Sequence, residues 1–162
     1  MKRKAIVIDL DSTVLDTQFI LDEIHKLGLK GDEKWEYFYK HCNSDRVEVI
    51  EETKKFLDTI LKATYEVEVK PRIITIDSVA LIASTARSKS CHNKTHKKLM
   101  SVGIYPDYIF MREKDDYRLA TEVKKDHLLV IMENFDIIAF IDDDLQNCEM
   151  AKSLGVLALR RV

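Results

Sequence analysis

The stretch "AIVIDLDSTV", residues 5–14, decides the fold, because it carries an apolar run directly into two carboxylates. Four consecutive apolar residues, 5–8, are typical of a strand buried on both faces of a parallel sheet. Asp9 and Asp11 follow, although aspartate is a poor strand residue and the two like charges repel each other. The pair therefore indicates a site that needs concentrated negative charge, for a metal ion or for acid–base chemistry.

The composition is that of a folded protein of ordinary domain size. The chain has 162 residues, 46% of them hydrophobic, which is enough for a sizeable core in one domain. No apolar run approaches the roughly 20 residues of a membrane span. The basic and apolar amino-terminal residues are too short a run for a signal peptide, so we expect a cytoplasmic protein without membrane contact. Three widely spaced cysteines suit a reducing compartment: Cys42, Cys91 and Cys148.

Apolar runs alternate with segments of helical periodicity along the chain. An edge strand interrupted by Pro71 is expected in 65–77, where apolar and polar residues alternate. The whole pattern implies an α/β fold with a mostly parallel sheet flanked by helices. Other strands are predicted over 4–10, 78–84, 107–111, 136–144 and 156–160, and helices over 17–28, 32–42, 46–63, 92–102, 120–133 and 145–154.

Three of the predicted strands end in polar residues of complementary chemistry. In parallel sheets of this kind, ligands bind at the carboxyl ends of the strands. We therefore expect acids from two strand ends, and hydroxyls with a basic residue from a third, to form one site. The residues concerned are Asp9, Asp11, Ser84, Thr85, Arg87, Asp142, Asp143 and Asp144.

Such a group of residues suits phosphoryl transfer. Like charges about 4 Å apart are costly in a partly buried site, and Mg²⁺ removes that cost while also binding substrate phosphate. One carboxylate can attack phosphorus to form an aspartyl-phosphate, and a second, two residues on, can act as general acid and base. A strand-end hydroxyl and a helix N-terminus can hold phosphate oxygens, and a lysine can neutralise charge.

Four motifs occur in a fixed order: "DLDST" (9–13), "LIASTAR" (81–87), Lys124 within "EVKKDHL" and "FIDDD" (140–144). Together they resemble the haloacid dehalogenase-like (HAD) phosphatases over nearly the whole chain. The resemblance implies a single Rossmann-like domain over 1–162, with a small helical cap or an extra hairpin within 14–77. It also implies Asp9 as nucleophile, Asp11 as general acid and base, Thr85 as phosphoryl ligand, Lys124 as stabilising lysine, and Mg²⁺ held by Asp9, Asp142, Asp143 and the backbone carbonyl of Asp11.

The second half carries a closer resemblance. Residues 102–128 and 135–156 are similar to the 3′-phosphatase domain of bacteriophage polynucleotide kinase/phosphatase. This likeness implies that Arg87, Arg112 and Arg118 contact substrate or phosphate, in addition to Ser84 and Thr85. It implies a DNA or RNA 3′ end as substrate, in nucleic-acid repair, and a separate kinase or ligase as a candidate partner.

The sequence departs from the family pattern at two positions and has no kinase motif. Ser12 stands where the family usually has glycine, and Asp144 stands where the kinase/phosphatase pattern has arginine. The P-loop pattern G-x-x-x-x-G-K-[ST] does not occur in the sequence.

The residue patterns also allow plainer interpretations. Lys124 and the adjacent Lys125 compete for the lysine position, and Thr85 or Asp144 can serve as helix N-caps. Arg112 and Arg118 can pair with nearby acids, and the aromatic residues within 35–39 suit a core better than a base-stacking surface.

The charge distribution leaves the substrate open. The formal net charge is −2, but the window between Asp77 and Asp107 contains no acidic residue. Its cations form either a solvated helix face or a rim that attracts phosphates. The alternatives to a polynucleotide phosphatase are an enzyme for nucleotides or other small phosphomonoesters and an inactive binding module. The cations are Arg87, Lys89, Lys94, Lys97 and Lys98.

Overall fold

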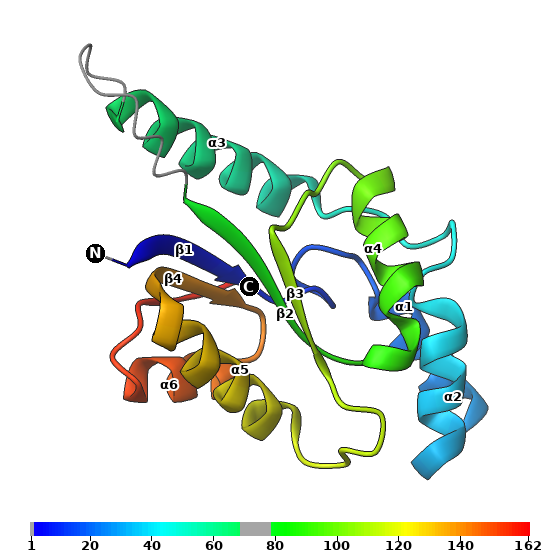
Figure 1. Cartoon of the computed structure of the whole chain (residues 1–162). Helices are drawn as coiled ribbons and strands as arrows, with labels where there is room; N and C mark the ends of the chain where they lie inside the picture. The colour runs from blue at the N-terminus through cyan, green and yellow to red at the C-terminus, as the bar shows by residue number, and fades with distance from the viewer. Residues whose placement is uncertain (1, 69–78) are drawn as a thin grey trace.

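A computed structural model describes residues 2–68 and 79–162 and shows a parallel sheet with helices on both faces (Figure 1). The sheet has five strands in the order β3-β2-β1-β4-β5, and every pairing is parallel. The predicted α/β class is therefore confirmed. The strands are β1 (Arg3–Ile8), β2 (Ala80–Ser88), β3 (Tyr108–Arg112), β4 (Phe135–Asp142) and β5 (Ala158–Arg160).

The helices lie close to their predicted positions, with one late start and one late end. They are α1 (Gln18–Leu27), α2 (Gly31–His41), α3 (Glu51–Glu68), α4 (His92–Ser101), α5 (Ala120–Asn134) and α6 (Leu145–Ser153). A short 3-10 helix, Lys89–Cys91, leads into α4. No helix in the two described stretches is both long and apolar enough to cross a membrane.

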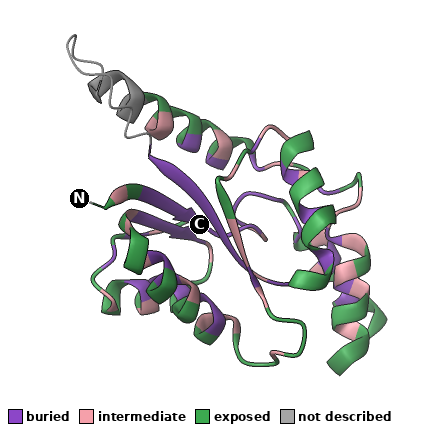
Figure 2. Cartoon of the chain, in the orientation of Figure 1, coloured by how far each residue is buried: buried purple, intermediate pink, exposed green. Residues whose placement is uncertain are grey.

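The continuous apolar run of β1 is explained by two cores, one on each face of the sheet. Ile6 and Ile8 join the core beneath α1, α2, α3 and α4, whereas Ala5 and Val7 join the core beneath α5 and α6. Because successive strand side chains point to opposite faces, a strand covered on both sides must be apolar at every position. Figure 2 shows the central strands buried and the outer helix faces exposed.

The helix predicted over 46–63 begins five residues later than expected. Residues just before α3 are extended and bond to the segment after β1: the Asp16 N–H donates to the Glu48 carbonyl at 2.9 Å, and the Ile50 N–H to the Val14 carbonyl at 2.8 Å. These backbone groups are therefore committed to a cross-chain pairing, which excludes the helical ladder. The pairing also ties α3 to the loop that carries the first carboxylate motif.

The edge strand predicted from 65 onward is wrong for its first residues. Residues 65–68 continue α3, because apolar alternation over so few residues does not distinguish strand from helix and extending a formed helix is easier than starting a strand. The remainder of that prediction, including Pro71, lies outside the described residues.

Candidate active site

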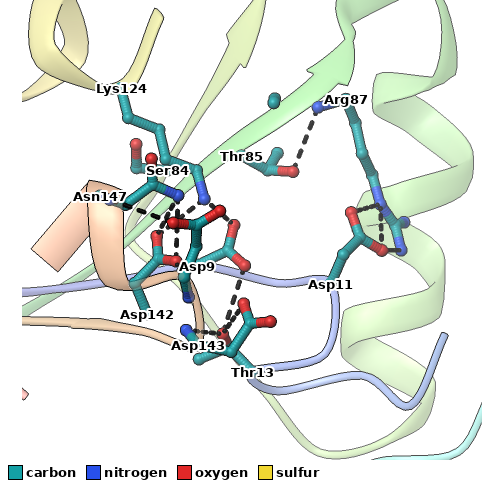
Figure 3. A network of polar contacts seen from close by, with 12 residues as sticks. Asp9, Asp11, Thr13, Ser84, Thr85, Arg87, Lys124, Asp142, Asp143 and Asn147 are labelled. Carbon is teal, nitrogen blue, oxygen red and sulfur yellow. Dashed lines mark hydrogen bonds and ion pairs between the residues drawn. The ribbon is translucent and has the colours of Figure 1, made fainter. Parts of the chain in front are cut away.

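The carboxyl ends of β1 and β4 meet the first turns of α5 in a buried polar cluster (Figure 3). Asp9 lies directly after β1 and is 3% exposed, and Asp142 is the last residue of β4 and is fully buried. Lys124 reaches them from α5 and is 4% exposed. Residues far apart in the sequence thus meet at the sheet edge where the topology places ligands.

Lys124 bridges the two buried carboxylates. Its Nζ lies 2.7 Å from Asp9 Oδ1 and 2.7 Å from Asp142 Oδ2. Burial alone acts to lower the pKa of Lys124, but the two carboxylate charges reverse that effect and raise the pKa above its ordinary value. The neighbouring Lys125 is exposed. Of the two candidate lysines, the structure therefore places Lys124 in the cluster.

Thr13 joins Asp9 to Asp143. Its hydroxyl oxygen accepts from the Asp143 N–H at 3.0 Å, and its proton can go to Asp9 Oδ2 at 3.3 Å or to Asp143 Oδ1 at 3.2 Å. A hydroxyl has one proton, so it serves one carboxylate at a time. At least one of these acids therefore keeps a free lone pair towards the cluster.

The cluster has the donors and the charge for a divalent cation. Carboxylate oxygens from Asp9, Asp142 and Asp143 lie within 4.8 Å of one another. With Lys124 included, three carboxylates and one ammonium leave a net charge of −2. Burial, reinforced by Asp142 and Asp11 and opposed by Lys124, raises the pKa of Asp9 to about 8. A hard dication with oxygen ligands would offset this cost.

Asp142 is the most firmly held of these acids. Its oxygens accept hydrogen bonds from the Asp144 N–H at 2.9 Å and from the Asn147 side-chain amide at 3.1 and 3.2 Å, besides the Lys124 contact. Asp144 itself points away and caps α6, accepting from the N–H groups of Gln146 and Asn147. The N-cap interpretation of Asp144 is therefore the one the structure supports.

Asp11, although only two residues from Asp9, lies in a different group (Figure 3). Arg87 grips both of its oxygens, with Nη2 2.6 Å from Oδ1 and Nε 2.9 Å from Oδ2. The Arg87 guanidinium also donates to the Cys42 carbonyl, to Asn43 Oδ1 and to Thr95 Oγ1. The Asp11 side chain therefore lies with this arginine and apart from the three clustered acids, and the metal-ligand prediction for Asp11 rests on its backbone carbonyl.

Arg87 is 1% exposed, so it differs from the surface cation that its place in the basic window suggested. An arginine this deeply buried needs partners for its donors, and the four acceptors on Asp11, Cys42, Asn43 and Thr95 supply them. The prediction that Arg87 touches substrate remains a prediction, whereas its contact with Asp11 is a feature of the structure.

Ser84 and Thr85 lie within β2, because this strand continues four residues beyond its predicted end at Ser84. Both are fully buried. Thr85 Oγ1 accepts from the Arg87 N–H at 3.2 Å, and Ser84 Oγ lies 3.0 Å from Nδ1 of His127 on α5. Burial lowers the pKa of His127 to about 4, so its ring is neutral at pH 7.

Arg112 and Arg118 hold a surface loop in shape. Arg112 donates to the carbonyls of Ala86, Asp116 and Arg118 at 2.9, 3.0 and 2.6 Å. Arg118 pairs with Asp116 at 2.7 Å and with Asp126 at 2.8 Å, and its hydrogen bonds lower the pKa of Asp116 to about 2. The ion-pair interpretation thus describes Arg118, while Arg112 binds backbone carbonyls. Their predicted contacts with substrate remain predictions.

Several site residues were not identified from the sequence. Thr13 stood within a recognised motif, and its place four residues after Asp9 was the available signal. Asn147, His127, Asn43 and Thr95 carry no sequence signal of their own, because each reaches its partner across packed elements. Their partners are separated by 5, 43, 44 and 8 residues.

Comparison with known proteins supports the fold. No protein-family model matches the chain, and no curated protein sequence matches it. Among solved structures, a chain of the Pnkp1/Rnl/Hen1 RNA repair complex matches 99% of this chain at a TM-score of 0.69 and 18% identity. The class C acid phosphatase from Bacillus anthracis matches 91% at a TM-score of 0.64 and 23% identity.

A HAD-family enzyme from Bacteroides thetaiotaomicron, solved as a magnesium complex, matches 99% of this chain at a TM-score of 0.54 and 15% identity. The chain therefore has the haloacid dehalogenase-like fold that its four motifs predict, and its structural neighbours are phosphatases and related HAD enzymes. It spans 42% of the RNA repair chain and 54% of the acid phosphatase.

Proposed function

We propose that this chain is a magnesium-dependent phosphomonoesterase that works through an aspartyl-phosphate. The observation that carries the proposal is the buried group in which Lys124 bridges Asp9 and Asp142 beside Asp143. A purely structural role would not require three acids whose charges exceed those of the available cation. Mg²⁺ bound by these acids would supply the missing positive charge against the phosphate oxygens of a substrate.

In the first half-reaction, a carboxylate oxygen of Asp9 attacks phosphorus, and the bond from phosphorus to the ester oxygen breaks. Lys124 keeps Asp9 ionised and in place for this attack. Asp11 gives its proton to the departing oxygen. In the second half-reaction, Asp11 removes a proton from the water that attacks phosphorus, which releases inorganic phosphate and restores Asp9.

Arg87 bears on the acid role of Asp11. It contacts both oxygens of the Asp11 carboxylate, which favours the ionised form that accepts a proton from water. Donation of a proton in the first half-reaction requires that one of these contacts be exchanged. We therefore assign Arg87 the role of positioning Asp11.

The test of this proposal is phosphate release by Asp9→Asn, which keeps the shape of the side chain and removes the nucleophile. We expect a loss of at least a thousandfold in kcat for a small chromogenic phosphomonoester, and loss of wild-type activity on chelation of magnesium. Asp136→Asn is the matched control, because Asp136 is an exposed aspartate at the opposite end of β4. Near-normal turnover by Asp9→Asn would refute the aspartyl-phosphate mechanism.

We further propose that the natural substrate is a polynucleotide 3′-phosphate, with a separate kinase or ligase as a candidate partner. The likeness of fold to a chain of an RNA repair complex supports this choice. So does the acid-free stretch that forms α4, on which Lys94 and Lys97 are exposed. Lys98 is half-buried and donates to the Ser44 carbonyl at 3.0 Å, which gives it a structural role.

An oligonucleotide series tests this substrate. KM should fall as a 3′-phosphorylated oligonucleotide lengthens from one to several nucleotides, and affinity should fall steeply with salt. Replacing Lys94 and Lys97 with alanine should reduce the slope of log affinity against log salt by about 1. Equal turnover of a 3′-mononucleotide, without an effect of these replacements, would favour a small-molecule phosphatase. The structural likeness to an acid phosphatase is the observation that keeps this second candidate in place.

A further inference from the structure

A groove of about 520 Å³ lies beside the candidate active site, lined by residues of α2, of the ends of β2 and β3, and of the loop 113–119. Ala86 and Ser88 contribute from β2, directly after the predicted phosphoryl ligand Thr85. Strand residues advance about 3.3 Å each, so this part of the groove lies within about 10 Å of Thr85 along the strand. Figure 1 shows α2 and the loop beyond the same ends of β2 and β3.

The groove presents exposed aromatic and apolar side chains. Trp35 on α2 is 49% exposed, and Tyr117 and Leu119 on the loop are 84% and 71% exposed. Phe38 shows the contrast within α2, because it lies on the buried face of the helix in the core. The expectation that these aromatic residues form core therefore holds for Phe38 and does not hold for Trp35.

Two features make Trp35 a suitable surface for a flat ring. Tyr39, one helical turn later, also lines the groove, and its ring is nearly parallel to that of Trp35, at 26° with centroids 6.3 Å apart. Lys34 Nζ lies 4.8 Å from the Trp35 ring centroid, which brings a cation next to the aromatic surface. Aromatic rings beside a positive charge are the combination that binds single-stranded nucleic acid.

The cations that line the groove are largely committed to its own structure. Arg112 holds the loop 113–119 to β2 through the carbonyls of Ala86, Asp116 and Arg118, and Arg118 is paired with Asp116 and Asp126. Asp32 and Glu36 from α2 balance the charge further. The groove therefore suits a neutral flat ring with polar edges better than a second phosphate.

We propose that this groove binds the nucleobase of the nucleotide whose phosphate occupies the active site, by stacking on Trp35. The inference rests on the proposed phosphatase function and adds the part of the substrate that the catalytic cluster does not touch. Tyr117 and Leu119 close over the ring from the loop, and Lys34 lies near the adjoining backbone phosphate. The groove thus favours nucleotide ends over phosphomonoesters without a base.

Trp35 is the one tryptophan of the sequence, so its fluorescence reports on this groove directly. The probe is a 3′-phosphorylated trinucleotide added to the Asp9→Asn chain, which cannot turn it over. We expect saturable quenching with the base-bearing trinucleotide and little quenching with the same trinucleotide abasic at its 3′ nucleotide. Saturable binding of the base-bearing probe by calorimetry without any change in fluorescence would overturn the proposal.

Kinetics provide the second measurement. In the wild type, KM for the abasic substrate should exceed KM for the base-bearing substrate by roughly tenfold, as expected for loss of one stacked base. Trp35→Ala should bring this ratio close to one, and Trp35→Phe should largely restore it. Tyr105→Ala is the matched control, since Tyr105 is 63% exposed but precedes β3 and so lies at the opposite edge of the sheet. A ratio unchanged in Trp35→Ala would refute stacking.

The two measurements separate this inference from the proposed function. Quenching by the trinucleotide without phosphate release from any substrate by the wild type would refute the phosphatase and leave a base-binding groove. Phosphate release that does not depend on the base, without quenching, would refute the groove and leave the phosphatase.

Discussion

Lys124 and Arg112 both make several polar contacts at the carboxyl edge of the sheet, but in opposite settings. Lys124 lies buried between carboxylates from β1 and β4, and its two ion pairs join three separate elements. Arg112 lies at the flank of the sheet, at the end of β3, and its three hydrogen bonds go to backbone carbonyls. One region gathers charge that its own residues do not neutralise, and the other neutralises its charge locally.

This difference teaches how to distinguish a reactive site from a structural one. In the centre, three acids face one ammonium, and burial raises the pKa of Asp9 to about 8. At the flank, the pairing of Arg118 with Asp116 lowers the pKa of that acid to about 2, which is the mark of a satisfied ion pair. Unbalanced buried charge indicates a function, whereas balanced surface charge indicates loop structure.

The largest effect is expected for Lys124→Met. This change leaves Asp9 and Asp142 buried without their cation, so we expect the free energy of unfolding to fall by about 3–5 kcal/mol. Phosphatase activity should be lost as well. Urea denaturation and phosphate release are the measurements, and the exposed Lys125→Met is the control, with an expected change within about 0.5 kcal/mol. Equal effects of the two variants would show that Lys124 does not hold the centre.

A second prediction concerns His127, which lies between the two regions. Its ring bonds to Ser84 and lies 5.7 Å, between centroids, from Phe110 of β3. Because its pKa is lowered from 6.5 to about 4, the unfolded chain binds the proton more readily between these values. The stability that His127 contributes is complete above pH 6.5 and is lost as pH falls towards 4, by about 1.4 kcal/mol per pH unit.

The measurement is the free energy of unfolding against pH for the wild type and His127→Gln. The glutamine amide can still bond to Ser84 but does not titrate. The variant should lose the part of the acid slope between pH 4 and 6.5 that belongs to His127, an integrated difference of roughly 3 kcal/mol. Parallel curves for the two proteins would show that His127 is not buried as the structure places it.

A third prediction separates the two flank arginines. Arg112→Ala removes three hydrogen bonds to carbonyls and should lower the free energy of unfolding by about 2 kcal/mol. It should also loosen the loop 113–119, seen as faster proteolysis in that loop. Arg118→Ala removes exposed ion pairs, so its effect should be smaller and should shrink further at high salt. A larger loss from Arg118→Ala would reverse this assignment.

The smallest effect is expected at Ser12, which follows Asp11. Its φ is 60°, a left-handed conformation that glycine adopts without strain, and this explains why the family pattern has glycine there. Ser12→Gly should raise the free energy of unfolding by about 0.5–1 kcal/mol. Ser12→Ala, which retains the strained backbone, is the control in thermal denaturation. Destabilisation by glycine would mean that the serine side chain stabilises the turn between the two regions.

The sequence by itself determined the fold class and most of the central cluster. Continuous apolar strands have to be covered on both faces, and acids directly after such strands have to meet at one edge of a parallel sheet. Asp9, Asp142 and Asp143 followed from that rule alone. Their roles as nucleophile and metal ligands, like those of Asp11 and Thr85, came from the family resemblance and remain predictions.

The tertiary structure decided which cation serves which carboxylate. Asp9 and Asp11 are two residues apart, yet one meets Lys124 and the other meets Arg87, because α5 and β2 approach the strand end from different sides. It also turned Trp35 towards a groove and Phe38 into the core, and it set α3 to begin after a backbone pairing with the segment behind β1. Local patterns specify which face of an element is apolar, but long-range packing selects the partners, since contacts between distant residues leave no periodic trace in the chain.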